Sequence, residues 1–216
     1  MANFTEKKFI KFHVGSEEIH TLIDAVHAYS PNADKLTGDI VEGVVNRVNC
    51  SGIIAIVSRV IADINRTRNG NNKEAIDEYR QTIREILDHI DNLDENGKLS
   101  RPYLHLAIHG MKNKWYEDIE IGTLHGKTCS PKVKDWFVNE VEKHIKNLQI
   151  DIKFSGDPSK SVHRCGDQTS DLNYFGYGNN FNTFQIEINR TLREKHQKEL
   201  INIFSDIIIR FNEKFK

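Results

Sequence analysis

Short apolar runs alternate with amphipathic helical patterns along this chain, and that alternation is the strongest constraint on its fold. Stretches with the length and composition of buried strands lie at 20–28, 52–58, 103–108, 150–154 and 181–188. Stretches with apolar residues at helical spacing lie at 36–49, 74–93 and 130–147, and a last one runs through Ile201, Phe204, Ile208, Phe211 and Phe215. Strands that alternate with helices are typical of a largely parallel sheet with helices on both faces. The sequence therefore predicts a three-layer α/β sandwich.

Two of these elements carry a more specific signal. Pro131 is expected in the first turn of the helix at 130–147, where a missing amide hydrogen costs no hydrogen bond. The strand at 181–188 alternates in polarity, so its two faces are predicted to differ. Its polar face holds Thr183, Gln185 and Glu187, and its apolar face holds Phe184, Ile186 and Ile188.

Length, charge and cysteine content exclude several classes of protein. A chain of 216 residues suits one domain, 1–216, with a full core. With 30 Lys and Arg against 31 Asp and Glu, it lacks the basic excess of a nucleic-acid-binding protein. No apolar run is long enough to span a bilayer or, within the first thirty residues, to serve as a signal peptide. Three cysteines without CxxC spacing indicate a reducing compartment, so we expect a cytoplasmic protein. We expect it to bind neither nucleic acid nor membranes, and the sequence does not indicate its oligomeric state.

Polar residues follow several of the predicted strands at their carboxyl ends, where open α/β sheets bind ligands. His27 follows the first strand, Asp63 and Arg66 come after the second, His109 ends the third, and Glu187 lies near the end of the last. Two imidazoles, carboxylates and an arginine at one sheet edge are the composition of a mononuclear hydrolytic zinc site.

Each of these fragments also has an ordinary interpretation. A histidine at a strand end is more often structural than a ligand, and His105 fits simple packing. Asp63 could cap backbone amides while Arg66 forms a salt bridge, and Glu187 could face solvent from an edge strand. Only their order and spacing together favour a site.

Five blocks of the sequence occur in an order that resembles the N-formylglutamate amidohydrolase family. The blocks are "VHAYSPNADKLTG", "SRVIADINR", "LAIHGM", "EDIEIGT" and "FQIEINRTL". Related pieces occur in the wider group of zinc carboxypeptidase-like hydrolases, which includes the aspartoacylases and the phage poly-γ-glutamate hydrolases. The resemblance spans about residues 22–194 and implies a zinc carboxypeptidase-like fold.

The resemblance implies a role for individual residues. His27, Asp34 and His109 are similar to the ligands of a Zn²⁺ cofactor. Arg66 resembles an arginine that grips a substrate carboxylate, and Glu187 resembles the glutamate that activates a water molecule at the metal. Asn65, beside Arg66, and two residues of a late loop that borders the family's pocket, Arg164 and Tyr177, are candidate substrate contacts.

The implied reaction is hydrolysis of an amide bond in an N-acyl acidic amino acid or a γ-glutamyl-type substrate. The partner would be a small molecule or short peptide with a carboxylate. Three departures favour an alternative, a non-catalytic α/β binding module with a degraded metal site. Val26 replaces the family's usual proline, Asp34 lies seven residues after His27, and Ala107 replaces an aspartate that supports the metal ligand in many relatives.

Overall fold

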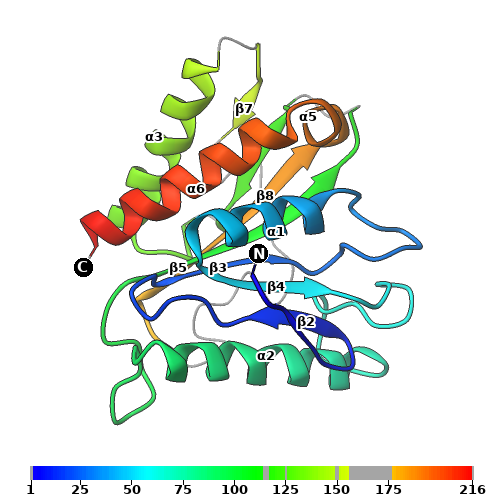
Figure 1. The fold of residues 1–216 in the computed structure, drawn as a ribbon, viewed down its shortest axis with the longest axis vertical. Helices are drawn as coiled ribbons and strands as arrows, with labels where there is room; N and C mark the ends of the chain where they lie inside the picture. The colour runs from blue at the N-terminus through cyan, green and yellow to red at the C-terminus, as the bar shows by residue number, and fades with distance from the viewer. Residues whose placement is uncertain (1, 114–116, 125, 149–150, 156–176, 216) are drawn as a thin grey trace.

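The central feature of the fold is a mixed sheet of eight strands, in the order β1-β2-β4-β3-β5-β8-β6-β7 (Figure 1). The computed structural model describes residues 2–113, 117–124, 126–148, 151–155 and 177–215. Within them the strands are β1 Thr5–Glu6, β2 Ile10–His13, β3 Thr21–Ala25, β4 Ser51–Ala55, β5 Tyr103–Met111, β6 Ile119–Gly122, β7 Phe154–Ser155 and β8 Phe181–Asn189. The four central strands, β4, β3, β5 and β8, are parallel, whereas β2 pairs antiparallel with β4 and β6 antiparallel with β8.

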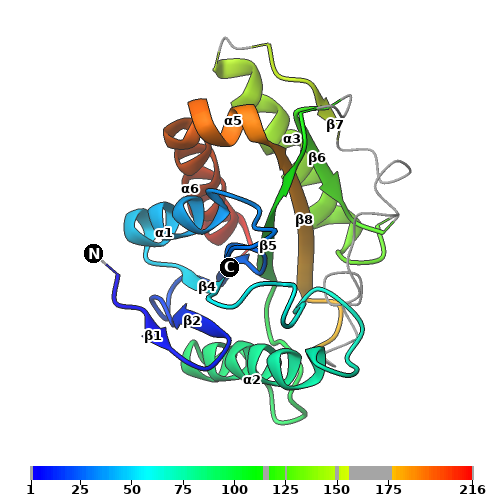
Figure 2. The ribbon, with the colours of Figure 1, turned by 90° about the vertical axis from the view of Figure 1, so that its right-hand side faces the viewer.

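Helices cover both faces of this sheet, as predicted. They are α1 Thr37–Val48, α2 Asn72–His89, α3 Pro131–Asn147, α5 Arg190–Lys195 and α6 Gln197–Lys214. The buried residues of α1, α3 and α6 form one apolar cluster on one face, and those of α2 form a second cluster on the other. Figure 1 shows α2 apart from the other helices, and Figure 2 shows α1 and α6 together on one side of β5 and β8. The three-layer α/β sandwich is confirmed.

The direction of the crossovers explains why α2 is alone on its face. The chain passes from β3 through α1 to its neighbour β4, and then returns through α2 to β5 on the other side of β3. Because such crossovers are right-handed, a reversal of direction moves the connecting helix to the opposite face. The reversal also makes the gap between β3 and β5 a topological switch point, where α/β sheets bind ligands.

The sequence predicted the long elements and missed the short ones. All the expected helices and central strands are present, and Pro131 begins α3 with Ser130 as its N-cap. The predictions did not include β1, β2, β6 or α5, and the strand expected at 150–154 is the two-residue β7. The strand expected to end at 108 continues to Met111. Short strands with mixed composition carry too few apolar residues for a periodic signal.

The predicted alternation of β8 is confirmed by its contacts. Phe184, Ile186 and Ile188 belong to the cluster under α1, α3 and α6, and Phe137 of α3 stacks on Phe184 with ring centroids 4.1 Å apart. On the opposite face, Thr183 lies beside His105 of β5. The polar stripe of β8 therefore shares its face with the histidines of β5.

Within the described residues no helix is both long and apolar enough to cross a membrane. Cys50 and Cys129 are buried free thiols, and Cys165 lies outside those residues.

A buried polar network lies on the α2 face. Asp24 of β3 is fully buried, and one of its carboxylate oxygens accepts hydrogen bonds from Tyr79 of α2 and from Nε2 of His105, the latter at 2.8 Å. Burial and the charge of Asp24 raise the pKa of Tyr79, so its hydroxyl stays a donor. His105 thus serves the packing role that its position allowed.

Replacement of Tyr79 by Phe should destabilise the protein by about 1–3 kcal/mol, because the buried Asp24 carboxylate loses a donor. Urea denaturation of the purified variant measures this change. Tyr103→Phe is the matched control, because Tyr103 is also fully buried but its hydroxyl lies near the Ser51 side chain and not beside a buried carboxylate. An equal loss in both variants would contradict a specific role for the Tyr79 hydroxyl.

Candidate metal centre

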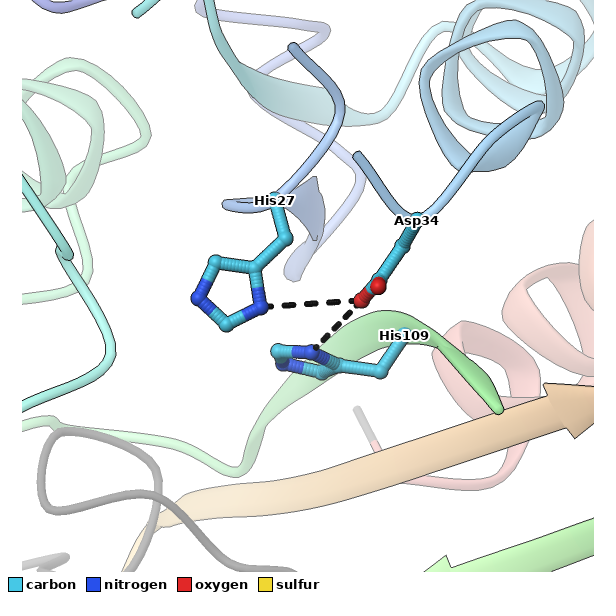
Figure 3. A group of neighbouring side chains, drawn as sticks. All are labelled: His27, Asp34 and His109. Atoms are coloured by element: carbon cyan, nitrogen blue, oxygen red, sulfur yellow. Dashed lines mark ion pairs between the residues drawn. The ribbon is translucent and has the colours of Figure 1, made fainter. Parts of the chain in front are cut away.

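Three side chains predicted as metal ligands lie together at the carboxyl edge of the sheet. His27, Asp34 and His109 each offer one ligand atom, and the three atoms lie within 4.8 Å of one another (Figure 3). The two imidazole rings meet edge to face, with centroids 4.9 Å apart. All three residues are at most 8% exposed. The structure brings the three together, and their role as metal ligands stays a prediction.

The loop after β3 folds back and places Asp34 beside His27 despite the seven-residue spacing. The backbone amide of Asp34 donates to the carbonyl of His27 at 2.8 Å. The Thr37 hydroxyl, in the first turn of α1, donates to the carbonyl of Asp34 at 2.7 Å, and the Ser58 hydroxyl holds the carbonyl of Pro31. The unusual spacing therefore does not separate these side chains.

The distances between the ligand atoms fit a shared metal ion better than hydrogen bonds. Oδ2 of Asp34 lies 3.5 Å from Nδ1 of His27 and 3.4 Å from Nδ1 of His109. Good hydrogen bonds between nitrogen and oxygen are shorter, about 2.7–3.2 Å. Tetrahedral zinc with bonds of about 2.0–2.2 Å separates its ligand atoms by about 3.3–3.6 Å. The buried Nδ1 of His27 also lacks a hydrogen-bond partner within the described structure.

Partners behind the three side chains orient the same atoms toward the centre. Nε2 of His27 donates to Oδ1 of Asp63 at 2.8 Å, which leaves Nδ1 as the free ligand atom. The Arg59 guanidinium binds Oδ1 of Asp34 and leaves Oδ2 facing both imidazoles. Nε2 of His109 lies 3.4 Å from the amide of Asn65. Asn65 therefore lies where it can support His109, although Ala107 replaces the aspartate that supports the metal ligand in many relatives.

The electrostatics of the cluster favour its charged forms. Burial alone would raise the pKa of Asp34, but its close contacts with His109 and His27 and the charge of Arg59 hold it far below its usual range. Burial would lower the pKa of His27, but the nearby carboxylate of Asp34 and the hydrogen bond to Asp63 outweigh burial and raise it. These contacts favour the protonated form of His27, which competes with a metal ion for the same nitrogen.

Glu187 lies next to His109 on the same face of the sheet. The two residues are directly opposite in the parallel ladder of β5 and β8, and adjacent strands are about 4.8 Å apart. The Glu187 carboxylate is partly exposed and accepts a hydrogen bond from the Gln185 amide at 3.0 Å. Glu120 of β6 is opposite Glu187 on its other side and is buried. Glu187 is thus fixed beside a predicted ligand while it still reaches solvent.

The predicted substrate contacts are distributed unevenly. The Arg66 side chain is 63% exposed, and its Nε lies 3.6 Å from Oδ2 of Asp63, so it borders the site. Asn65 is buried between His109 and Gln185. Tyr177 packs in the apolar cluster under α2 and stacks on Phe181 at the start of β8, whereas Glu187 lies near its end. This placement does not support a contact between Tyr177 and substrate, and Arg164 lies outside the described residues.

The buried side chain of Arg193 connects the three segments that carry the site. Its guanidinium donates to the backbone carbonyls of Ile188 at 3.1 Å, of Met111 at 3.5 Å, and of Lys35. Gly110 makes room for it, because a Cβ atom there would lie 2.6 Å from Cζ of Arg193. The sequence analysis missed both Arg59 and Arg193. Arg59 stands inside the block "SRVIADINR", whereas Arg193 stands in a run of charged residues that reads as a solvated helix face.

Comparisons with known proteins establish the fold. No family model matches the sequence, and no curated protein sequence matches it. The structure is similar to N-formylglutamate amidohydrolase from Ralstonia eutropha JMP134, with 18% identity, coverage of 95% of this chain and 97% of that chain, and a TM-score of 0.63. It is also similar to a bacteriophage poly-γ-glutamate hydrolase, with 10% identity, 97% and 92% coverage, and a TM-score of 0.57. For succinylglutamate desuccinylase from Vibrio cholerae the values are 12%, 97% and 66%, and 0.54.

The chain therefore shares its fold with these three hydrolases, and one of them is an N-formylglutamate amidohydrolase, the family whose motifs the sequence resembles. At such low identity the similarities show the fold alone.

Replacement of Arg193 by Lys should lower zinc affinity about 10-fold or more and lower the melting temperature. A lysine keeps the charge, but its compact ammonium lacks the planar fork that reaches the three carbonyls, so the loop that carries Asp34 and the strand end that carries His109 loosen. Competition with a chromophoric chelator measures the zinc affinity. Arg210→Lys is the control, because Arg210 is exposed on α6 and its contact with Glu140 is long, at 3.8 Å. If both variants bind zinc with the affinity of the native protein, Arg193 does not order the predicted ligands.

Proposed function

We propose that this chain is a zinc-dependent amidohydrolase. The observation that carries the proposal is a carboxylate oxygen that lies 3.4 Å and 3.5 Å from two imidazole nitrogens, separations that suit tetrahedral zinc, with Glu187 beside the set. Three protein ligands and an open position are typical of catalytic zinc. The proposed substrate is an N-acyl acidic amino acid or a γ-glutamyl-type peptide.

In this proposal His27, Asp34 and His109 hold the ion, and Glu187 handles protons. Zinc in such a site polarises a carbonyl group and lowers the pKa of a water molecule toward about 7. The Glu187 carboxylate takes a proton from the attacking water and delivers it to the leaving amine. Its hydrogen bond with Gln185 fixes the carboxylate for this role.

Arginines on either side of the ligands position the substrate. The exposed guanidinium of Arg66 would form a bidentate pair with a substrate carboxylate on the Asp63 side of the centre. Arg59 is bound to Asp34 and adds positive charge at the site. Asn65 supports His109 from behind rather than touching the substrate.

One observation favours the alternative, a binding module without metal. Asp34 is already neutralised by Arg59 and the two histidines, so the cluster is stable as an ion-pair network. Metal analysis separates the amidohydrolase from the binding module.

We also propose, from the sequence, that the protein acts as one cytoplasmic domain and binds neither nucleic acid nor membranes.

The native protein should bind one zinc ion per chain, and His27→Ala or His109→Ala should abolish stoichiometric binding, because each removes one of three protein ligands. Elemental analysis after dialysis against zinc measures this. His89→Ala, at an exposed position in the last turn of α2, should keep the ion. A native protein that purifies and reconstitutes without zinc would support the binding module.

Glu187→Gln should keep zinc and fold while turnover falls about 10²- to 10⁴-fold, since an amide preserves shape but cannot accept the proton. Hydrolysis of N-acyl glutamates, N-acyl aspartates and γ-glutamyl peptides is followed by release of the free amine, with zinc measured on the same samples. Full activity would remove Glu187 from the mechanism. Loss of zinc would make it a ligand instead.

A further inference from the structure

A cavity of about 730 Å³ opens at the amino-terminal edge of the parallel strands, away from the candidate metal centre. His20, which directly precedes β3, and Arg101, which lies just before β5, line it. Its other walls include the residues that follow α2 and the last turns of α6. The five residues of β3 rise about 3.3 Å each, so roughly 16 Å of strand separates the cavity from the edge that carries His27. Small-molecule sites have similar volumes, roughly 300–1,000 Å³.

The imidazole of His20 is a buried polar group in the wall of this cavity. The residue is only 7% exposed, and its Nδ1 has no hydrogen-bond partner among the described residues. Asn212 of α6 fixes the backbone beside the ring, because its side-chain oxygen accepts a hydrogen bond from the His20 amide at 2.7 Å. Burial and the charge of Arg101 lower the pKa of His20, so the ring is neutral near pH 7. A neutral imidazole can accept a hydrogen bond from an N–H group of a ligand.

Carboxylates dominate the charge around the same cavity. They belong to four exposed residues, Glu17, Glu18, Asp91 and Glu213. None of these side chains forms an ion pair with any residue that the structure describes. Four carboxylates face the single guanidinium of Arg101, so the lining is net negative. The cavity also lies at the carboxyl ends of α2 and α6, where the helix dipole favours a cation.

These walls suit an organic cation better than a metal ion. Apart from the candidate metal centre, the described residues form no group of three metal-binding side chains whose ligand atoms lie within 4.8 Å of one another. Ile19, Ile90 and Ile209 line the cavity together with the polar groups, and Ile209 is 42% exposed. Apolar walls favour a ligand with an apolar body, which a hydrated metal ion lacks.

We propose that this cavity is a second ligand site, separate from the candidate metal centre, and that it binds an alkylammonium or alkylguanidinium ion. The aliphatic body of the ligand packs on the three isoleucines, and its head group donates a hydrogen bond to the His20 ring. The exposed carboxylates attract its charge, whereas Arg101 opposes it and limits the affinity. The inference requires neither zinc nor hydrolysis, so failure of the proposed function would leave it standing.

The test titrates the native protein with probes that share one aliphatic body and differ in charge. The probes are pentylammonium, pentylguanidinium, pentanol and pentanoate, and nuclear magnetic resonance of methyl-labelled isoleucines follows binding near neutral pH. A cation should shift the methyl signals of Ile90 and Ile209 and bind at least about tenfold more tightly than pentanol, the effect of roughly two exposed charge pairs. Pentanoate should not bind. The ratio of the two cation affinities identifies the preferred head group.

Variants with effects of opposite sign separate a charged site from a general loosening of the fold. Glu213→Gln should weaken binding of the cations about two- to fivefold, and Arg101→Gln should strengthen it by a similar factor, because it removes the opposing charge. His20→Phe should weaken binding of the cations but not of pentanol. Glu142→Gln removes an exposed carboxylate from α3 and should leave the affinity unchanged. Equal affinity for pentanol and the cations, or no shift of the Ile90 and Ile209 signals with any probe, would overturn the site.

Discussion

The buried guanidinium of Arg193 is the interaction on which the geometry of the site depends. Its three acceptors are backbone carbonyls that adjoin the site residues. Lys35 follows Asp34, Ile188 follows Glu187, and Met111 comes two residues after His109. Burial lowers the pKa of Arg193, while the charges of Asp34 and Glu187 oppose that shift. One planar group with five N–H donors thus connects two strand ends and a loop.

Polar side chains of β5 and β8 lie in a row along one face of the sheet beneath Arg193. His105 and His109 of β5 point to the α2 face, and the directly opposed residues of β8 are Thr183 and Glu187. His105 is fixed by Asp24, which Tyr79 holds in turn. His105 and His109 therefore differ in their position along β5. His105 lies under α2 in the core, and His109 lies at the carboxyl end of the strand, where the predicted metal ligands meet.

The sequence predicted what depends on periodicity and on local order. Central strands and long helices were found because parallel strands are apolar throughout and amphipathic helices repeat every 3.6 residues. Strands β2 and β6 were missed, because each has only four residues, in which apolar and other side chains are mixed. Both pair antiparallel with the outer strands of the parallel centre. Gly110 follows His109 inside β5, which continues to Met111, and its missing side chain makes room for Arg193.

The site depended on contacts that sequence spacing does not show. The fold-back of the loop after His27 is fixed by a backbone hydrogen bond, which any residue at position 34 could make. The partner of His27 lies 36 residues away, at Asp63. The family resemblance suggested Tyr177 as a substrate contact, in a late loop that borders the family's pocket, yet its ring packs on Phe181 in the core. Motif order predicted which residues gather, whereas tertiary contacts decide which atoms face the centre.

Basic side chains gather at one edge of an almost neutral chain. One cavity is lined by Asp34 together with Lys35, Arg59, Lys112, Arg190 and Arg193. The mutual repulsion of these cations is offset in part, because Arg59 pairs with Asp34, Arg190 pairs with Glu194, and Arg193 donates to three backbone carbonyls. A net charge of −1 for the whole chain is therefore compatible with a local excess of positive charge beside Asp34, because the charge of a surface depends on where the residues lie and not on their total.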